Sequence, residues 1–478
     1  MKQIFKRRTY IVLLFLLALL GNGCKKYLDV NKDPNNPADV QESLILTPVE
    51  TAISTVLAGG CLTIGNYQTV GVVNAYWTQQ LALNQLAPQP DVYRLRPDDI
   101  DQFFLSMYST MLQNLKILNS KAEQRGNHVY GAIAKILTAY TLGAATDMWG
   151  DIPYSQAFDG KLKVPYDKQE DVYKTLQSLL DSAITESTLT PGLTTPGSDD
   201  LLYGGKIASW VKFAYTLKAR YYMHLTKAPG YNAVTQANLA LAALQKGFTK
   251  QSEEATFAAY SDNSGSEGPW YENIDPSAGP NVLASTLVDS LKKRNDPRLP
   301  ILATVNTDSI YKGRLLGDTV ATDAGVYSVI NEFYAGPDAP QPLLTWSEAL
   351  FLKAEATLIV SGAATAEPIY LNGIKSHMTK LGLDLTDPDV VAYLAARGSF
   401  AGAIPLQRIM EEKSIANFLS IENFNDWRRT GYPALSIVLS PYVPSIPRRY
   451  PYPLAEITSN PQPQQSAKIT DRVWWDAP

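Results

Sequence analysis

Apolar residues recur with the period of an α-helix in several separate stretches of this chain. Within residues 128–150, Ile133, Ile136, Leu137 and Tyr140 lie at spacings that place them on one side of a helix. The same pattern predicts amphipathic helices over residues 170–184, 209–225, 231–244, 344–362 and 366–382. Glycine or proline separates neighbouring segments, so the helices are expected to come in pairs.

Helix pairs with short breaks and small residues at the crossing are the building unit of tetratricopeptide-type repeats. The sequence therefore predicts an all-α fold in which tetratricopeptide-like helix pairs form a superhelical scaffold. A strict period of about 34 residues is absent, and long loops interrupt the series. Periodicity alone leaves a helical domain without repeat ancestry as the alternative.

Residues 250–345 differ from the helical stretches because they are rich in glycine, proline, asparagine and serine. Loops of this length in a folded chain are usually functional. The region carries Trp270, Tyr271 and Tyr334 among polar residues, and we expect these rings to be exposed. The proline-rich residues 442–478 predict a coil that covers the helices.

The amino terminus has the pattern of a secretion signal. Four basic residues, Lys2, Lys6, Arg7 and Arg8, precede the apolar residues 11–20. This apolar block is shorter than the roughly 20 residues that a membrane-spanning helix needs, and its length and flanks are typical of a signal peptide.

Cys24 directly follows the small residues that end this signal. A cysteine at that position is the lipid attachment site of bacterial lipoproteins. The usual leucine three residues earlier is replaced by Gly21, so an ordinary secreted protein with a stray cysteine is the alternative. The expected organisation is a lipoprotein signal peptide over 1–23, a lipid-anchored tether over 24–45 and a helical domain over 46–478.

Charge and cysteine content exclude several classes of protein. The net charge of the chain is −4, and loss of the four basic residues of the signal lowers it to −8, which disfavours nucleic acid as a partner. Cys61 has no partner once Cys24 is acylated, so no disulfide framework is expected. The sequence holds no recognisable phosphate-binding, zinc or serine-hydrolase motif, and no cofactor or metal is predicted.

Asp147 and Asp151 form the one compact carboxylate pair that suggests a glycosidase. Gly150 and Pro153 stop the helix at this point, and the preferred interpretation is that both acids brace a helix end.

Six motifs, taken together and in order, resemble the SusD/RagB family of outer-membrane nutrient-binding lipoproteins of Bacteroidetes, especially its second SusD-like branch. They are YLDVNKDPNNP, ATDMWGDIPYSQAF, LKKRNDPRLPI, LTWSEALFLKAEA, FNDWRRTGYPAL and IPRRYPYPLAEITSNP. The resemblance runs from Tyr27 to the carboxyl terminus.

This resemblance implies a lipid-anchored protein at the cell surface, with a helical scaffold and a loop-rich ligand-binding half. It also implies capture of oligosaccharides, or less often peptides, without enzymatic activity, and delivery to a SusC-type TonB-dependent transporter. A surface glycoside hydrolase and a ligand-free structural adaptor of a transporter complex are the alternatives.

A glycan site needs aromatic rings for the apolar faces of sugars and polar side chains for their hydroxyl groups. Residues 65–85 and 267–273 have this composition, and Asn84 and Glu272 lie among them. The predicted ligand-binding residues are Tyr67, Asn74, Tyr76, Trp77, Trp270, Tyr271 and Asn273. For Trp77, burial in the core is the preferred interpretation, whereas Trp270 is the stronger candidate.

Four arginines stand beside aromatic residues in the last two motifs: Arg428, Arg429, Arg448 and Arg449. They can bind a carboxylated ligand, but we expect them to pair with acids such as Asp426, Glu422 and Glu456 and to pin the coil to the helices.

Overall fold

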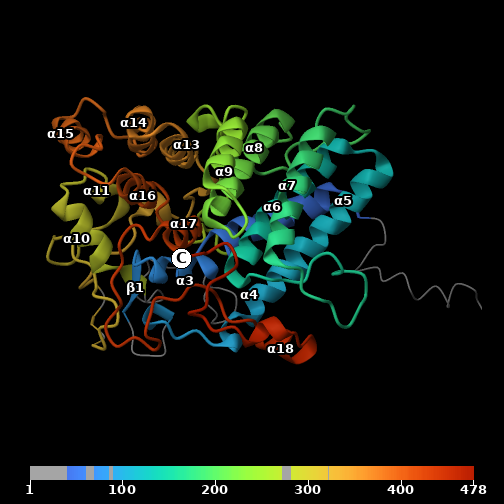
Figure 1. The fold of residues 1–478 in the computed structure, drawn as a ribbon, viewed down its shortest axis with the longest axis horizontal. Helices are drawn as coiled ribbons and strands as arrows, with labels where there is room; N and C mark the ends of the chain where they lie inside the picture. Colours follow the sequence, from blue (N-terminus) through green and yellow to red (C-terminus); the bar gives the residue numbers. More distant parts are fainter. Residues whose placement is uncertain (1–39, 61–68, 85–89, 272–280, 321, 324) are drawn as a thin grey trace, which may run out of the picture.

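A layer of long helices and a second half of short elements and coil make up the protein (Figure 1). The computed structural model describes residues 40–60, 69–84, 90–271, 281–320, 322–323 and 325–478. Cys24, Cys61 and the predicted signal peptide lie outside these ranges. Within them, none of the helices combines the length and apolar character that a bilayer span requires.

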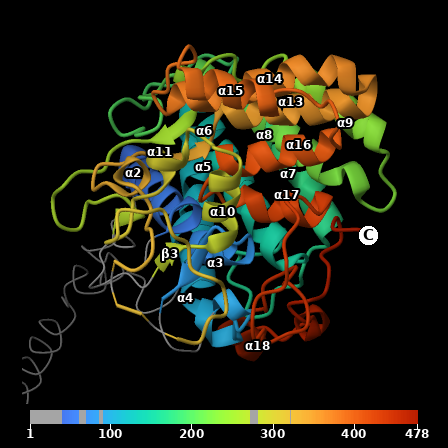
Figure 2. The ribbon, with the colours of Figure 1, turned by 90° about the vertical axis from the view of Figure 1, so that its left-hand side faces the viewer.

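The helical layer follows the predicted periodicity. Each of its helices packs on the next, from α5 through α9 to α13 and α14 (Figures 1 and 2). Their bounds are α5 Gln113–Arg125, α6 His128–Trp149, α7 Gln169–Glu186, α8 Ile207–His224, α9 Ala233–Leu244, α13 Trp346–Ser361 and α14 Ala363–Lys380. The all-α class and the tetratricopeptide-like pairing predicted from sequence are confirmed.

Local sequence signals set the ends of these helices. The Thr345 hydroxyl oxygen accepts a hydrogen bond from the backbone N–H of Glu348 (3.1 Å) and caps the start of α13. Gly362, with a φ of 83°, ends α13 and lets α14 begin at once. Gly150, with a φ of 79°, ends α6 as expected.

The remaining helices are short. They are α2 Ser43–Ala52, α3 Val70–Trp77, α4 Asp101–Leu105, α10 Ser285–Lys293, α11 Leu299–Leu302, α12 Glu332–Ala335, α15 Pro388–Arg397, α16 Pro405–Ala416, α17 Glu422–Thr430 and α18 Leu454–Ser459. Two of them pack on the helical layer: α2 on α5, and α16 on α13 and α14. Wider π-helical turns over Ile53–Ala58 and Ser106–Leu112 extend α2 and α4.

Two small antiparallel sheets, which the sequence did not predict, join distant parts of the chain. Strand β1 (Leu81–Leu83) pairs with β3 (Asn281–Leu283), and β2 (Ala255–Phe257) pairs with β4 (Gln341–Leu344). The first sheet ties the loop-rich region after α9 to the segment that follows α3, and the second joins the two ends of the loop-rich region.

The carboxyl-terminal coil covers the helices, as predicted, and the short helix α18 interrupts it. The guanidinium of Arg449 donates to the carbonyl of Trp149 at the end of α6, and the backbone N–H of Tyr450 donates to the carbonyl of Met148 (2.9 Å). Trp475 is fully buried, and its Nε1 donates to Asp147 Oδ1 (3.0 Å). These contacts fix the coil to α6.

The NDPRL motif forms a buried ion pair beneath α10. Arg298 donates to both carboxylate oxygens of Asp296 (2.8 and 2.7 Å) and to Glu412 Oε2 on α16 (2.6 Å). None of these three side chains is exposed. This ion pair joins the segment between α10 and α11 to α16.

Glu50 on α2 is a fully buried carboxyl group next to a second acid, Asp200. Its Oε2 accepts from the backbone N–H of Leu201 (2.6 Å). Burial and then repulsion from Asp200 raise the pKa of Glu50 well above its usual value. The folded protein therefore holds a proton on Glu50 that the unfolded chain releases at lower pH.

The variant Glu50→Gln tests whether Glu50 is protonated in the folded protein. Glu50 favours folding most below its unfolded pKa, and that contribution is lost as the pH rises through the folded pKa. A glutamine amide binds no proton in this range, so the stability of the variant should fall less than that of the parent as the pH rises above the usual pKa of a glutamate. Urea unfolding across this range measures the effect. Parallel pH dependences for parent and variant would contradict it.

Candidate functional site

Helix α3 places three of the predicted ligand-binding residues in the core. Trp77 is fully buried between Phe424 and Tyr450, with ring centroids 5.4 and 4.9 Å away. Its Nε1 donates to the carbonyl of Pro90 (2.9 Å). The preferred interpretation of Trp77 as a core residue is confirmed.

The polar groups of the other two residues on α3 hold structural partners. Asn74 is 2% exposed, and its Oδ1 accepts from the hydroxyl of Tyr450 (2.7 Å). Tyr76 is fully buried, and its hydroxyl donates to Asn281 on β3. In this conformation neither side chain presents a surface to a ligand.

Trp270 is 2% exposed, so the expectation of an exposed ring at this position is wrong. Glycines at positions 60 and 71 leave the space that the indole fills, since a Cβ at Gly60 would lie 2.3 Å from the ring. The indole Nε1 also donates to Gln341 Oε1 (3.1 Å). The adjacent Tyr271 is 39% exposed.

The remaining predicted residues divide into two groups. Tyr67, Asn273 and Glu272 lie outside the described residues, so their role stays a prediction. Asn84 is half-buried, and its Oδ1 accepts from Arg314 Nη1 (2.8 Å) while its amide donates to the carbonyl of Thr322 (2.9 Å).

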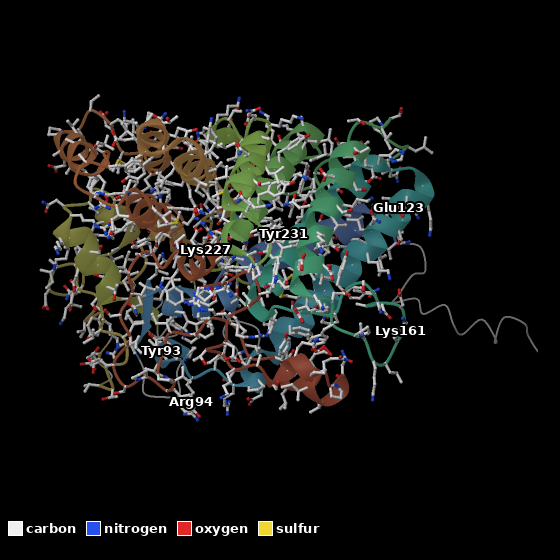
Figure 3. The ribbon with its side chains drawn as sticks, in the orientation of Figure 1. Tyr93, Arg94, Glu123, Lys161, Lys227 and Tyr231 are labelled. Carbon is white, nitrogen blue, oxygen red and sulfur yellow. The ribbon has the colours of Figure 1, made fainter. Side chains whose placement is uncertain are left out.

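Tyr442 is an exposed aromatic residue that the sequence analysis missed. Its ring is 68% exposed, and the guanidinium of Arg94 lies 5.7 Å from the ring centroid. Figure 3 shows Arg94 at the lower edge of the molecule, beside Tyr93. A signal for this exposure was present, since Pro441 and Pro444 flank Tyr442 in an extended coil.

Residues 433–442, which we name the coil strip, carry Tyr442 and pack against the loop-rich half. The backbone N–H of Val438 donates to the hydroxyl of the buried Tyr93 (3.3 Å). The backbone N–H groups of Leu439 and Tyr442 donate to the carbonyls of Leu316 (3.1 Å) and Val92 (2.8 Å). The strip is thereby held at several points along its length.

A groove of about 800 Å³ begins where the coil strip starts. Its walls are α10, α16, the end of α15, residues 402–404 and residues 433–435, with residues 78–80 also lining it. Figure 2 shows α10 and α16 on the same side of the molecule. We name this hollow the arginine groove, after Arg294, Arg397 and Arg408 in its walls.

Glu411 on α16 holds two of these arginines. Its Oε2 lies 3.1 Å from Nη2 of Arg294, the residue that follows α10, and accepts from Nη2 of Arg397 at the end of α15 (2.7 Å). Gln407 donates to the other oxygen (2.8 Å). Burial acts to raise the pKa of Glu411. The neighbouring partners outweigh burial, Arg294 having the largest effect among them, and they hold the pKa below its usual value.

The acid pair that suggested a glycosidase is structural. Asp147 is 3% exposed and accepts from Tyr173, Trp475 and Asn425. Asp151 Oδ1 accepts from the backbone N–H of Gln169 (2.9 Å) and caps α7. Both acids brace helix ends, as interpreted from the sequence.

The four motif arginines are also structural, as expected. Arg429 pairs with Glu355 and Asp426, and Arg448 pairs with Asp476 (2.5 Å). Arg428 donates to Asn425 Oδ1 (2.6 Å). The expected partners Glu422 and Glu456 instead contact other residues: Glu422 accepts from His224 and Asn425, and Glu456 from Tyr166.

The protein is a helical scaffold with a loop-rich half, and comparison with known proteins gives its family. Residues 34–453 match the SusD-like_2 family, described as "Starch-binding associating with outer membrane". The match spans most of the chain, which therefore belongs to this SusD-like family. No curated protein matches the chain.

Solved structures of SusD-like proteins share the fold. A SusD/RagB family protein from Bacteroides thetaiotaomicron superposes with a TM-score of 0.78 at 23% identity, over 92% of this chain and 99% of that one. A chitin-binding SusD homologue from Flavobacterium johnsoniae has a TM-score of 0.77 at 22% identity, over 91% and 98% of the two chains. A SusD homologue from Bacteroides uniformis gives 0.73 at 24% identity, over 91% and 99%.

Substitution of the buried tryptophan tests its position. We expect Trp270→Ala to lower the free energy of unfolding by about 3–5 kcal/mol, because it opens a cavity against Gly60 and Gly71. Tyr271→Ala, at the exposed neighbour, should change it far less. Urea denaturation measures both variants. Equal stability of Trp270→Ala and the parent would mean that the indole is not packed in solution.

Proposed function

We propose that this protein is a cell-surface lipoprotein that binds oligosaccharides and delivers them to a SusC-type TonB-dependent transporter. Its role is capture without turnover. The coil strip and the arginine groove supply the binding surface, and Cys24 supplies the anchor in the outer membrane. Peptide is the less favoured ligand.

The observation that carries this proposal is the family match over residues 34–453, which includes both halves of the fold. The family is described as starch-binding and associated with the outer membrane, and one structural relative is a chitin-binding protein. A fold alone does not determine a ligand, so the geometry of the candidate site must support the same function.

That geometry suits a sugar chain. A volume of about 800 Å³ lies within the range of about 300–1,000 Å³ typical of ligand sites. The groove walls mix polar side chains with apolar ones such as Leu287, Ile404 and Leu435. Tyr442, at the far end of the coil strip, offers an exposed ring of the kind that packs on a sugar face.

The acid pair that suggested the hydrolase alternative, Asp147 and Asp151, is engaged in structural contacts. Glycoside hydrolysis requires two carboxyl groups on either side of the scissile bond. Asp147 is buried and its oxygens are taken by three donors, and Asp151 holds the start of α7. The loss of Asp147 as a free acid leaves Asp151 without its partner, which favours binding alone.

A binding titration tests the capture role. The chain from Lys25 onward should bind malto- or chito-oligosaccharides and release no shortened products. Tyr442→Ala should weaken this binding about tenfold, equivalent to about 1.4 kcal/mol, through loss of the exposed ring. Calorimetry measures the affinity, and chromatography of the same samples detects cleavage.

Tyr215→Ala is the matched control, because Tyr215 also lies beneath a cation, Lys246 at 5.3 Å, but stands on α8 in the helical layer. This variant should bind like the parent. Release of shortened sugars would favour a hydrolase. Binding of peptides but not of oligosaccharides would mean that the ligand is a peptide. Binding of neither class would favour a structural adaptor of the transporter complex.

Replacement of Cys24 tests the anchor. In cells, the parent protein should sediment with membranes and carry lipid on Cys24, whereas Cys24→Ser should be released. Cys61→Ser, at the other cysteine, should remain on the membrane. Fractionation and mass spectrometry of the amino-terminal peptide measure both. Membrane retention of Cys24→Ser would contradict lipid anchoring.

A further inference from the structure

We infer that the arginine groove binds an anionic group, so that the ligand is an acidic oligosaccharide bearing carboxylate or sulfate. This inference rests on the proposed carbohydrate-binding function and narrows its ligand class. Three features of the groove lead to it: its charge, the arrangement of its arginines and an unsatisfied donor.

The charge of the groove is opposite to that of the protein. Four cationic side chains line it and only two acidic ones, Asp289 and Glu411. The cations are Lys293, Arg294, Arg397 and Arg408. The groove therefore has a net formal charge of +2 on a chain whose net charge is −4. Such a local excess attracts an anion where the rest of the surface repels it.

Glu411 orients two of the arginines without using all their donors. Each guanidinium has five N–H groups in a rigid plane. Arg294 Nη2 lies 3.1 Å from Glu411 Oε2. Arg397 donates one N–H to Glu411 and one to Glu412 (3.1 Å). Both side chains are partly exposed, at 20% and 13%. Their remaining N–H groups are available for carboxylate or sulfate oxygens.

Arg408 supplies the most direct indication of a ligand. It lines the groove from α16, and its Nη1 is buried with no hydrogen-bond partner in the part of the chain that the structure describes. A buried charged donor without a partner is costly. An anionic ligand group in the groove would satisfy it once the guanidinium turns toward the groove. Arg429 on α17 differs from Arg408, because both of its terminal nitrogens donate to carboxylates, those of Glu355 and Asp426.

The test compares charged and neutral ligands of equal length on the chain from Lys25 onward. The probes are an oligogalacturonate, a sulfated oligosaccharide and a malto-oligosaccharide, measured by calorimetry at low and high salt. We expect at least one acidic probe to bind more tightly than the neutral one, and the difference to shrink with salt. The two acidic probes distinguish carboxylate from sulfate as the recognised group.

Arg408→Gln should weaken acidic binding about ten- to hundredfold, as expected for loss of a charge-assisted hydrogen bond. Neutral binding should weaken by a smaller factor, since the neutral probe makes no ionic contact, and Arg408→Lys should restore part of the preference. The control is Arg472→Gln, at a 40% exposed arginine near the carboxyl terminus, which should bind like the parent. Circular dichroism shows whether each variant folds. If Arg408→Gln does not fold, Arg294→Gln takes its place in the test.

The outcomes separate this inference from the function on which it rests. If neutral sugars bind as tightly as acidic ones, or Arg408→Gln keeps the acidic preference, the inference is wrong while oligosaccharide capture stands. If no saccharide binds, the proposed function fails and this inference fails with it. Tighter binding of an acidic probe that depends on Arg408 supports both.

Discussion

Buried hydrogen bonds between the carboxyl-terminal coil and α6 hold the two halves of this protein together. A coil lacks the regular hydrogen bonds of helices and sheets, so its polar groups need partners elsewhere. Here Arg449 reaches the carbonyl of Trp149, Tyr450 reaches Asn74 on α3, and Trp475 reaches Asp147. These bonds are shielded from water, which strengthens each of them. The candidate binding surface depends on this attachment because the coil strip belongs to the same carboxyl-terminal segment.

The sequence predicted the helical layer well because the signals for a helix lie within its own stretch of sequence. The stripe of Ile133, Ile136 and Leu137 marks the buried side of α6, and Gly150 marks its end, without reference to any distant residue. The strands were missed for the opposite reason. Each is three or four residues long, and its partner lies far away in the chain, as with Leu81 and Leu283.

The site was harder to predict, because exposure and pairing are set by tertiary packing. Trp270 stands among glycine, proline and polar residues, a composition typical of exposed loops, yet Gly60 and Gly71 open the space that buries it. Arginines pose the same problem. Arg408 and Arg429 both lie on helices, but only Arg429 has carboxylate partners within the described residues. No local pattern separates the two.

Two adjacent acids on α16 connect the scaffold to the arginine groove. Glu412 is buried and accepts from Arg298, which also pairs with Asp296 beneath α10. Glu411, one residue earlier, contacts Arg294 and Arg397 in the groove wall. The buried pair fixes α16 relative to α10, and this fixed spacing sets the distance between the groove arginines. A ligand that meets donors already held in place loses less conformational entropy on binding, since the ordering was achieved when the chain folded.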